Sequence, residues 1–172
     1  DIRRELYALA TIDRLTGCYN RHALMEFSEK FISSARRHRY PVSMLVIDLD
    51  HFKAVNDNHG HAVGDQVLEA MGALLNRNFR EDDLVTRYGG EEFVVLMTHC
   101  CGEDALRKAE KIRVGIQELK PGDLEITASI GVTSIEVGSS SDFEAMFYAG
   151  DEGVYAAKKS GRNQVVFVAQ EE

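Results

Sequence analysis

Two aspartates stand at the end of the most apolar segment of the chain. Residues 42–49 (Val-Ser-Met-Leu-Val-Ile-Asp-Leu) are almost continuously apolar, which predicts a buried central strand. Side chains alternate along a strand, so Asp48 and Asp50 are expected on the same face. Carboxylates that leave a buried strand are costly without a partner, and this strand end is therefore a candidate cation site.

A second acidic pair follows two glycines. Glu91 and Glu92 come directly after Gly89 and Gly90, between two short strand-like runs, and this pattern predicts the tip of a β-hairpin. If the hairpin joins the same sheet, its tip can lie beside Asp48. Three or four hard oxygens at one place suit Mg²⁺ with phosphate oxygens as further ligands. Taken one at a time, each carboxylate is better explained as a solvated charge at a strand end.

Basic and amide side chains near these elements have the chemistry to bind a nucleotide. Lys53 follows the acidic strand end, and Lys158 and Arg162 lie at the end of a predicted helix, where cations are favourable in their own right. Asn56 and Asp65 suit a purine edge, because a carboxylate accepts from the guanine ring N–H and amino group while an amide donates and accepts. From composition alone, turn or cap chemistry is the simpler explanation of both.

Other polar clusters carry weaker signals. His59 and His61 lack the helical HxxxH or Cys/His spacing of a transition-metal site. His99-Cys100-Cys101 is interpreted as a loop without function, and an odd number of cysteines, two of them adjacent, argues against a disulfide framework. Residues 80–83 (Arg-Glu-Asp-Asp), taken alone, are a charged surface turn.

Hydrophobic periodicity predicts an α+β domain. Ile2, Leu6 and Leu9 share one helical face, which we interpret as the end of a linker or signalling helix within residues 1–12, with the main domain over 13–172. Asn20 is a candidate N-cap of the next helix. After that helix the expected order is β-α-α-β-β-α-β-α-β, which fits one mixed central β-sheet flanked by helices. The expected strands cover 42–49, 84–88, 93–97, 124–135 and 164–168, a polar connection covers 51–64, and the last helix covers 143–159.

Composition limits the partners of the chain. Of 172 residues, 44% are hydrophobic, 28 are acidic and 20 are basic. A net charge of −8 argues against general affinity for nucleic acid, which rests on neutralising many phosphates. No apolar run approaches the roughly 18 residues of a membrane span, so we expect no membrane contact by this domain. The three cysteines, without a disulfide framework, fit a reducing, cytoplasmic setting. The chain does not begin with Met, which suggests a segment of a longer protein that can itself be membrane-anchored.

Together these segments resemble the GGDEF-domain diguanylate cyclase family, in its GGEEF form. The resemblance runs from Asp13 to about Val168, and six motifs stand in the order typical of the family. Cys18 replaces the usual Leu, a change that affects packing rather than chemistry. The motifs are residues 13–21, 48–53, the set 56–57 with 60–61 and 64–65, 87–93 (Arg-Tyr-Gly-Gly-Glu-Glu-Phe), 129–132 and 149–163.

The resemblance implies condensation of two GTP molecules into cyclic di-GMP with release of two pyrophosphates. It also implies a fold similar to nucleotidyl cyclase catalytic domains and polymerase palms. By position, Asp48, the Leu49 carbonyl and Glu91 would hold two Mg²⁺ (or Mn²⁺) ions, which lower the pKa of the attacking 3′-hydroxyl. Glu91 would accept the proton, with Glu92 assisting around the metals.

The same resemblance implies a GTP site. Lys53 and the amides of Phe52 and Lys53 would meet the β- and γ-phosphates, and Lys158 and Arg162 would clamp the triphosphate. The substrate-binding positions also include Asn56, His61 and Asp65. Of these, Asn56 and Asp65 would read the guanine, and an acid at position 65 favours GTP.

Dimerisation and feedback inhibition are implied as well. One domain holds one GTP, so the active species is expected to be a homodimer, aligned by an upstream sensor through the helix within 1–12. Arg80 and Asp83 match the RxxD product-binding site of the family, and Arg107 and Lys111 are candidates to complete it. Cyclic di-GMP would then inhibit its own synthesis.

Three other functions are alternatives to an active cyclase. A catalytically weak GGDEF domain that senses GTP or cyclic di-GMP usually has degenerate acidic motifs, whereas Asp48 and Glu91 are intact. A bare dimerisation module would not need Lys53, Asp65 and Lys158 together. A polymerase-like palm conflicts with the charge of −8. We therefore expect an active diguanylate cyclase.

Overall fold

A five-stranded mixed sheet forms the centre of the computed structural model, which describes residues 1–170. Its order is β2-β3-β1-β4-β5, and neighbouring strands are antiparallel except for the parallel pair β4 and β5. The predicted α+β class and mixed sheet are confirmed. The strands are β1 (Val42–Leu49), β2 (Leu84–Gly89), β3 (Glu92–Thr98), β4 (Ala128–Ile135) and β5 (Gln164–Phe167).

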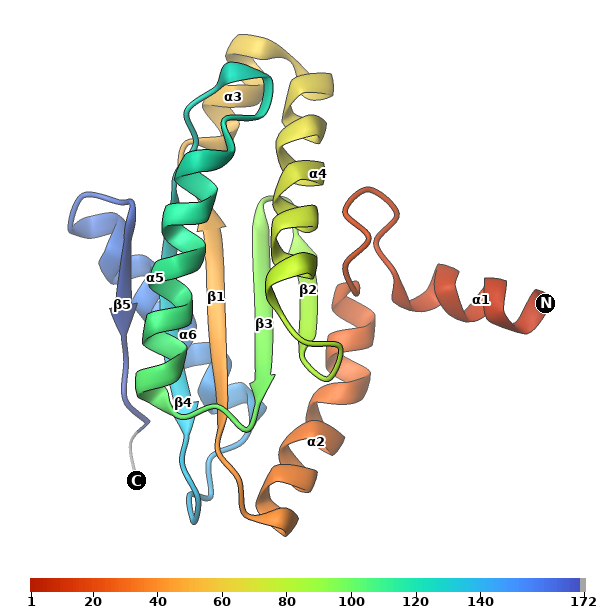
Figure 1. The fold of residues 1–172 in the computed structure, drawn as a ribbon, viewed down its shortest axis with the longest axis vertical. Coiled ribbons are helices and arrows are strands. Elements are labelled where there is room, and N and C mark those ends of the chain that lie inside the picture. Colours follow the sequence, from red (N-terminus) through yellow and green to blue (C-terminus); the bar gives the residue numbers. More distant parts are fainter. Residues whose placement is uncertain (171–172) are drawn as a thin grey trace.

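Helices cover both faces of this sheet. Figure 1 shows α4 and α5 on one face, α6 on the other, and α1 projecting away from the sheet. No helix among residues 1–170 is long and apolar enough to span a membrane. The helices are α1 (Ile2–Thr11), α2 (Arg21–His38), α3 (Phe52–His59), α4 (His61–Asn78), α5 (Gly102–Leu119), the 3₁₀ turn η1 (Pro121–Asp123) and α6 (Phe143–Lys159).

Strand β1 separates two cores and thereby directs its last side chains. Leu45 and Ile47 pack in the core that includes residues of α4 and α5, whereas Met44 and Val46 pack in the core with α2 and α6. Because successive side chains of a strand alternate between faces, Asp48 follows Met44 and Val46 toward α6. The alternation predicted from sequence thus decides which helix meets the first acidic residue.

Two expected boundaries are wrong. Residues 52–59 of the expected polar connection form helix α3, because Phe52 and Val55 pack against the core and anchor an otherwise polar segment. The strand expected over 124–135 begins only at Ala128, since the preceding residues pair with no strand of the sheet. Thr127 instead accepts a hydrogen bond from the Asp50 amide at 2.9 Å.

The start of α2 is as predicted. Asn20 is its N-cap, and the side-chain oxygen accepts from the Ala23 amide at 2.9 Å. The same side chain donates to the Ala10 carbonyl of α1 at 3.0 Å. One residue therefore begins α2 and ties α1 to it.

Candidate active site

The turn between β2 and β3 lies beside the end of β1. Asp48 is paired in register with Glu92, and the Leu49 amide donates to the Glu91 carbonyl at 3.3 Å. Gly90 has a φ of 49°, and a side-chain carbon at Gly89 or Gly90 would have no heavy atom within 4 Å. The structure therefore brings both acidic pairs of the sequence to one end of the sheet, around an open turn.

Arg87 ties this turn to the segment that follows α1. Its Nε donates to the Gly90 carbonyl at 3.0 Å, and its Nη1 lies 3.3 Å from Asp13 Oδ1. The other oxygen of Asp13 accepts from the amide and the hydroxyl of Thr16, which closes the turn after α1. The open turn is thus held in a fixed position relative to the end of α1.

Asp48 has a buried oxygen that accepts no hydrogen bond. Its Oδ1 lies 3.1 Å from Lys158 Nζ of α6, an ion-pair distance, but no donor among residues 1–170 is directed at it along a hydrogen bond. Burial raises the pKa of Asp48, the Lys158 ammonium opposes the rise, and the Glu91 carboxylate adds to it. A cation beside Oδ1 would satisfy both the charge and the unbonded oxygen.

Glu92 shows that negative charge is crowded at this place. Burial raises the pKa of Glu92 to about 7, and the carboxylates of Asp151 and Asp48 contribute to the rise. Within residues 1–170, no three His, Cys, Asp or Glu side chains converge closely enough to hold a metal ion by themselves. The arrangement fits Mg²⁺, which takes one or two carboxylates and completes its shell with phosphate or water oxygens.

The raised pKa of Glu92 predicts a pH-dependent stability. In metal-free buffer, protonated Glu92 stabilises the fold below its ordinary pKa of 4.5, and this contribution is lost as the pH rises through about 7. Between about pH 4 and about pH 8, Glu92→Gln should therefore gain at most about 3 kcal/mol of unfolding free energy relative to the parent. Urea unfolding of both proteins measures this difference, and a difference independent of pH would contradict the prediction.

Asp50, expected beside Asp48 as a further oxygen ligand, is used inside the fold. Asp50 is 5% exposed, and its carboxylate accepts three hydrogen bonds. The donors are Thr127 Oγ1 at 2.7 Å, Ser129 Oγ at 2.7 Å and the Asn163 amide at 3.0 Å. These bonds join the end of β1 to β4 and to the turn after α6, so the Asp50 carboxylate is used inside the fold.

The residues expected to bind the nucleotide lie along α3 and α4. Lys53, His61 and Asp65 have exposed side chains in the first turns of these helices, and no side chain caps α3. A side-chain carbon at Gly64 would lie 1.9 Å from Asn56 Oδ1, so glycine is what allows the Asn56 amide to lie against α4. Asn56 and Asp65 are thereby brought to neighbouring positions.

Lys158 and Arg162 approach the same end of the sheet from α6. Lys158 contacts Asp48, so attraction to the carbonyls of its own helix end does not by itself explain its position. Arg162 lies just beyond the helix with a φ of 66°, and its Nε is buried without a hydrogen-bond partner among the described residues. Arg162 is therefore available to an anionic ligand, while Lys158 lies at the same end of the sheet in an ion pair with Asp48.

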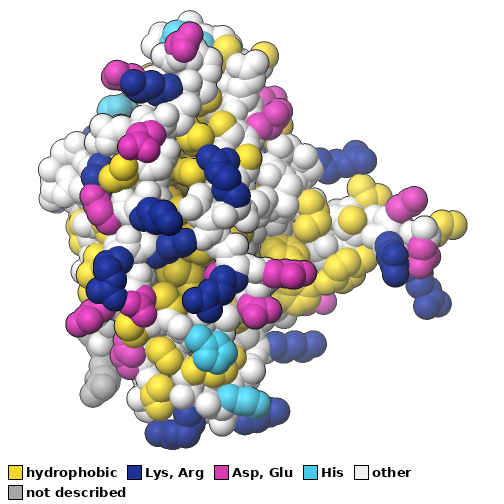
Figure 2. All heavy atoms as spheres, in the orientation of Figure 1, with side chains coloured by type: hydrophobic (Ala, Val, Ile, Leu, Met, Phe, Trp, Pro, Cys, Tyr) yellow, Lys and Arg dark blue, Asp and Glu magenta, His cyan; other side chains and the backbone are white. Residues whose placement is uncertain are grey.

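A separate cavity of about 200 Å³ is lined by Arg80 and Asp83. The two oxygens of Asp83 accept from the Arg80 amide at 3.0 Å and from the Thr98 amide at 3.1 Å, so this carboxylate shapes the turn that carries Arg80. From α5, Lys108 reaches the cavity with its Nζ 5.0 Å from the centre of the Phe79 ring. Figure 2 shows Lys and Arg side chains gathered over the face formed by α4 and α5.

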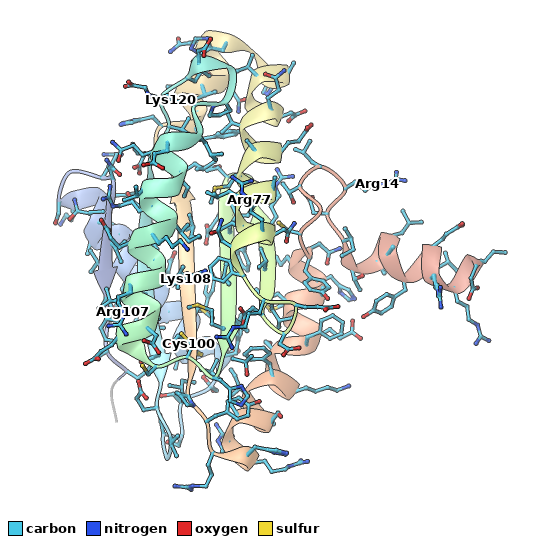
Figure 3. The ribbon with its side chains drawn as sticks, viewed as in Figure 1. Arg14, Arg77, Cys100, Arg107, Lys108 and Lys120 are labelled. Carbon is cyan, nitrogen blue, oxygen red and sulfur yellow. The ribbon has the colours of Figure 1, made fainter. Side chains whose placement is uncertain are left out.

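The sequence predicts Arg107 and Lys111, and not Lys108, as the residues of α5 that complete this site. Neither of these two lines the cavity, and the Arg107 guanidinium pairs with Asp104. Figure 3 shows Cys100, Arg107 and Lys108 around the first turns of α5. The sequence signal that marks Lys108 is its position four residues after Asp104, on the same helix face.

Comparison with known proteins places this chain in a family. The family model "Diguanylate cyclase, GGDEF domain" matches residues 10–164. The chain is 44% identical over 164 residues to the response regulator PleD of Caulobacter vibrioides, covering 92% of this chain and 36% of PleD. It is 35% identical over 157 residues to the diguanylate cyclase DosC of Escherichia coli, covering 90% of this chain and 34% of DosC. The chain thus spans about a third of the length of these curated relatives.

Solved structures agree with this assignment. The coiled coil and GGDEF domain of DgcB from Caulobacter crescentus, in complex with c-di-GMP, superposes with a TM-score of 0.87 at 27% identity, covering 97% of this chain and 92% of DgcB's. The active GGEEF domain of a Vibrio cholerae diguanylate cyclase gives a TM-score of 0.82 at 32% identity, covering 90% of this chain and 99% of the other. With the acidic hairpin turn, the open glycines and the matching fold in place, the chain belongs to the GGDEF diguanylate cyclase family.

Proposed function

We propose that this domain is a diguanylate cyclase that joins two GTP molecules into cyclic di-GMP and releases two pyrophosphates. The observation that carries the proposal is the buried Oδ1 of Asp48, which pairs with Lys158 Nζ at 3.1 Å and otherwise has no hydrogen-bond partner among residues 1–170. A carboxylate in this state suits a divalent cation whose other ligands are phosphate oxygens. The names of the relatives support the proposal, since DosC is a diguanylate cyclase and the Vibrio cholerae domain is described as active.

Two Mg²⁺ or Mn²⁺ ions would be held by Asp48, the Leu49 carbonyl and Glu91. When bound, such ions neutralise the triphosphate and lower the pKa of the attacking 3′-hydroxyl. Glu91 accepts the proton of that hydroxyl at its carboxylate. Glu92 lies beside it and contributes negative charge around the cations.

Side chains of the domain bind and orient GTP. Lys53, with the amides of Phe52 and Lys53, holds the β- and γ-phosphates, and Lys158 and Arg162 hold the triphosphate from α6. Lys53 also stabilises charge that develops on the phosphates in the transition state. Each of these groups is a hydrogen-bond donor, either a cationic side chain or a backbone amide at the start of α3.

Guanine is read at the junction of α3 and α4. Asp65 accepts from the ring N–H and the amino group, and Asn56 donates and accepts from its place against Gly64. His61 is the first residue of α4, the helix that also carries Asp65, and it completes the substrate site. The carboxylate of Asp65 favours guanine over adenine, which offers no pair of donors at these positions.

A second copy of the domain supplies the second GTP. Each 3′-hydroxyl must attack an α-phosphate held by the partner, so the active species is a homodimer with two-fold symmetry. Helix α1, within the segment 1–12, projects from the domain (Figure 1) and is suited to relay alignment from an upstream sensor. The contacts of Arg87 with Asp13 and the Gly90 carbonyl connect that segment to the acidic turn.

Incubation of the purified domain with GTP and Mg²⁺ at high protein concentration tests the proposal, with nucleotides separated by chromatography. The parent should form cyclic di-GMP, and Glu91→Ala should form none. If GTP binds but no product forms, even when the domain is forced to dimerise, the alternative of a GTP or cyclic di-GMP sensor is favoured. Absence of GTP binding would contradict the assignment of the site.

We also propose that the cavity beside Arg80 is a feedback site for cyclic di-GMP. A guanidinium can pair with phosphate and stack on guanine, the two groups that the product offers. Arg80 and Asp83 line the cavity, and Arg107 and Lys111 lie on the adjacent helix as further candidates. The structure of DgcB in complex with c-di-GMP shows that a relative binds this nucleotide.

Arg80→Ala should relieve inhibition by the product. Loss of a charged contact to phosphate is expected to raise the inhibitory concentration of cyclic di-GMP about tenfold or more. Initial rates at increasing cyclic di-GMP measure the effect. Arg14→Ala is the matched control, because Arg14 lies apart from the cavity beside α1 (Figure 3) and should keep the inhibition of the parent. Unchanged inhibition of Arg80→Ala would contradict the assignment.

A further inference from the structure

Asp50 joins three segments that are far apart in the sequence. Thr127 and Ser129 lie 77 and 79 residues away, and Asn163 lies 113 residues away, yet all three donate to its carboxylate. Two of the donors are side-chain hydroxyls, which also bond well to water. The third is a backbone amide in the turn that carries Arg162, and a buried carboxylate fixes such an amide firmly.

The turn after α6 has a backbone conformation that requires stabilising contacts. Arg162 has a φ of 66° and Asn163 a φ of 46°, two consecutive non-glycine residues in the left-handed region. L-residues adopt this region at a cost, and it persists where surrounding contacts impose it. The Arg162 amide donates to the Ala157 carbonyl at 2.9 Å, and Arg113 Nη1 donates to Asn163 Oδ1 at 2.8 Å. Asp50, at the end of β1, adds a third contact to this turn by accepting from the Asn163 amide.

We propose that Asp50 is a positioning residue that aims Arg162 at the substrate through its bond to the Asn163 amide. The inference rests on the proposed function, in which Arg162 holds the triphosphate. Arg162 Nε is buried without a hydrogen-bond partner among the described residues, so the orientation of the guanidinium depends on its backbone. Because Asp50 is two residues from Asp48, one strand end fixes both the proposed cation ligand and the proposed phosphate clamp.

The test is a double-mutant cycle on ligand binding. Affinity of the parent, Asp50→Ala, Arg162→Ala and the double variant is measured calorimetrically for 3′-deoxy-GTP with Mg²⁺, a ligand that lacks the attacking hydroxyl. Each single variant should bind about tenfold more weakly, and the double variant no more weakly than Arg162→Ala. Affinity for 3′-deoxy-GMP should be unchanged in all four, since Arg162 is proposed to contact the triphosphate.

A conservative variant separates positioning from general damage. In Asp50→Asn, the side-chain oxygen can still accept from the Asn163 amide while the amide group donates to the Ser129 hydroxyl. We expect its affinity for 3′-deoxy-GTP to stay within about twofold of the parent. A tenfold loss in Asp50→Asn would overturn the proposal, because the bond to Asn163 would then not be what matters.

Arg113→Ala keeps the inference testable if Asp50→Ala does not fold. Arg113 of α5, whose side chain is 17% exposed, holds the same turn through the Asn163 side chain, so its loss should weaken 3′-deoxy-GTP binding, and not further in the Arg162→Ala background. Additive losses in either cycle, or an unchanged affinity in Asp50→Ala, would overturn this inference alone. A parent that does not bind 3′-deoxy-GTP would overturn the proposed function and the inference with it.

Discussion

Asp48→Asn is expected to lower the cyclase rate at least about 10³-fold while the domain stays folded. Oδ1 of Asp48 is buried with the Lys158 ion pair and no hydrogen-bond partner among the described residues, and burial raises the pKa of this group, so its charge costs folding free energy. Asparagine has the same shape without that charge. The free energy of unfolding should therefore stay within about 1 kcal/mol of the parent, although the contact with Lys158 is weakened.

Initial rates of cyclic di-GMP formation and urea unfolding of the same preparations measure these two effects. Asp123→Asn is the matched control, since Asp123 is exposed in η1 with a φ of 62°, a conformation that asparagine tolerates. The control should keep the rate and the stability of the parent. If Asp48→Asn retained the rate, the cation site would have to lie elsewhere; if it unfolded, Asp48 would be structural.

Local sequence patterns predict most of the sheet. They fail for segments whose structure depends on a few contacts with the core or on pairing with a neighbouring strand. The apolar run of β1 and the glycine pair of the hairpin each fit within a few residues, so periodicity and turn chemistry reveal them. Helix α3 was expected as a polar connection because Phe52 and Val55 alone anchor it to the core. The strand expected from Leu124 begins at Ala128, since an apolar segment becomes a strand only where a neighbour pairs with it.

The chemical types of the site residues were predictable from the sequence. Which of them hold the fold together and which face the site was not. Asp48 and Asp50 look equivalent in the sequence, but the donors to Asp50 come from 77 to 113 residues away. Such long-range hydrogen bonds leave no local signal. The contact of Asn56 with Gly64 is of the same kind, because it depends on how α3 meets α4 rather than on either helix alone.

The close packing of α6 against β4 is a further feature that the sequence does not reveal. This packing determines where Lys158 and Arg162 lie. A side-chain carbon at Gly131 of β4 would lie 1.9 Å from the Gly150 carbonyl oxygen and 2.8 Å from the Val154 amide nitrogen. A carbon at Gly153 would in turn lie 2.7 Å from the Gly131 Cα. Helix and strand therefore meet backbone to backbone, with no flexible side chain that can move aside.

Gly131→Ala is accordingly expected to lower the free energy of unfolding by about 3 kcal/mol or more, because the added methyl group forces α6 away from β4. Urea unfolding measures the loss. Gly115→Ala in α5 is the matched control: its added carbon would lie 3.4 Å from a flexible Leu74 methyl, and alanine favours a helix by up to about 1 kcal/mol. If the free energy of unfolding of Gly131→Ala equalled that of this control, the backbone of α6 would not pack directly against β4. Since displacement of α6 also moves Lys158 from Asp48, any Gly131→Ala protein that remains folded should bind 3′-deoxy-GTP more weakly than the parent.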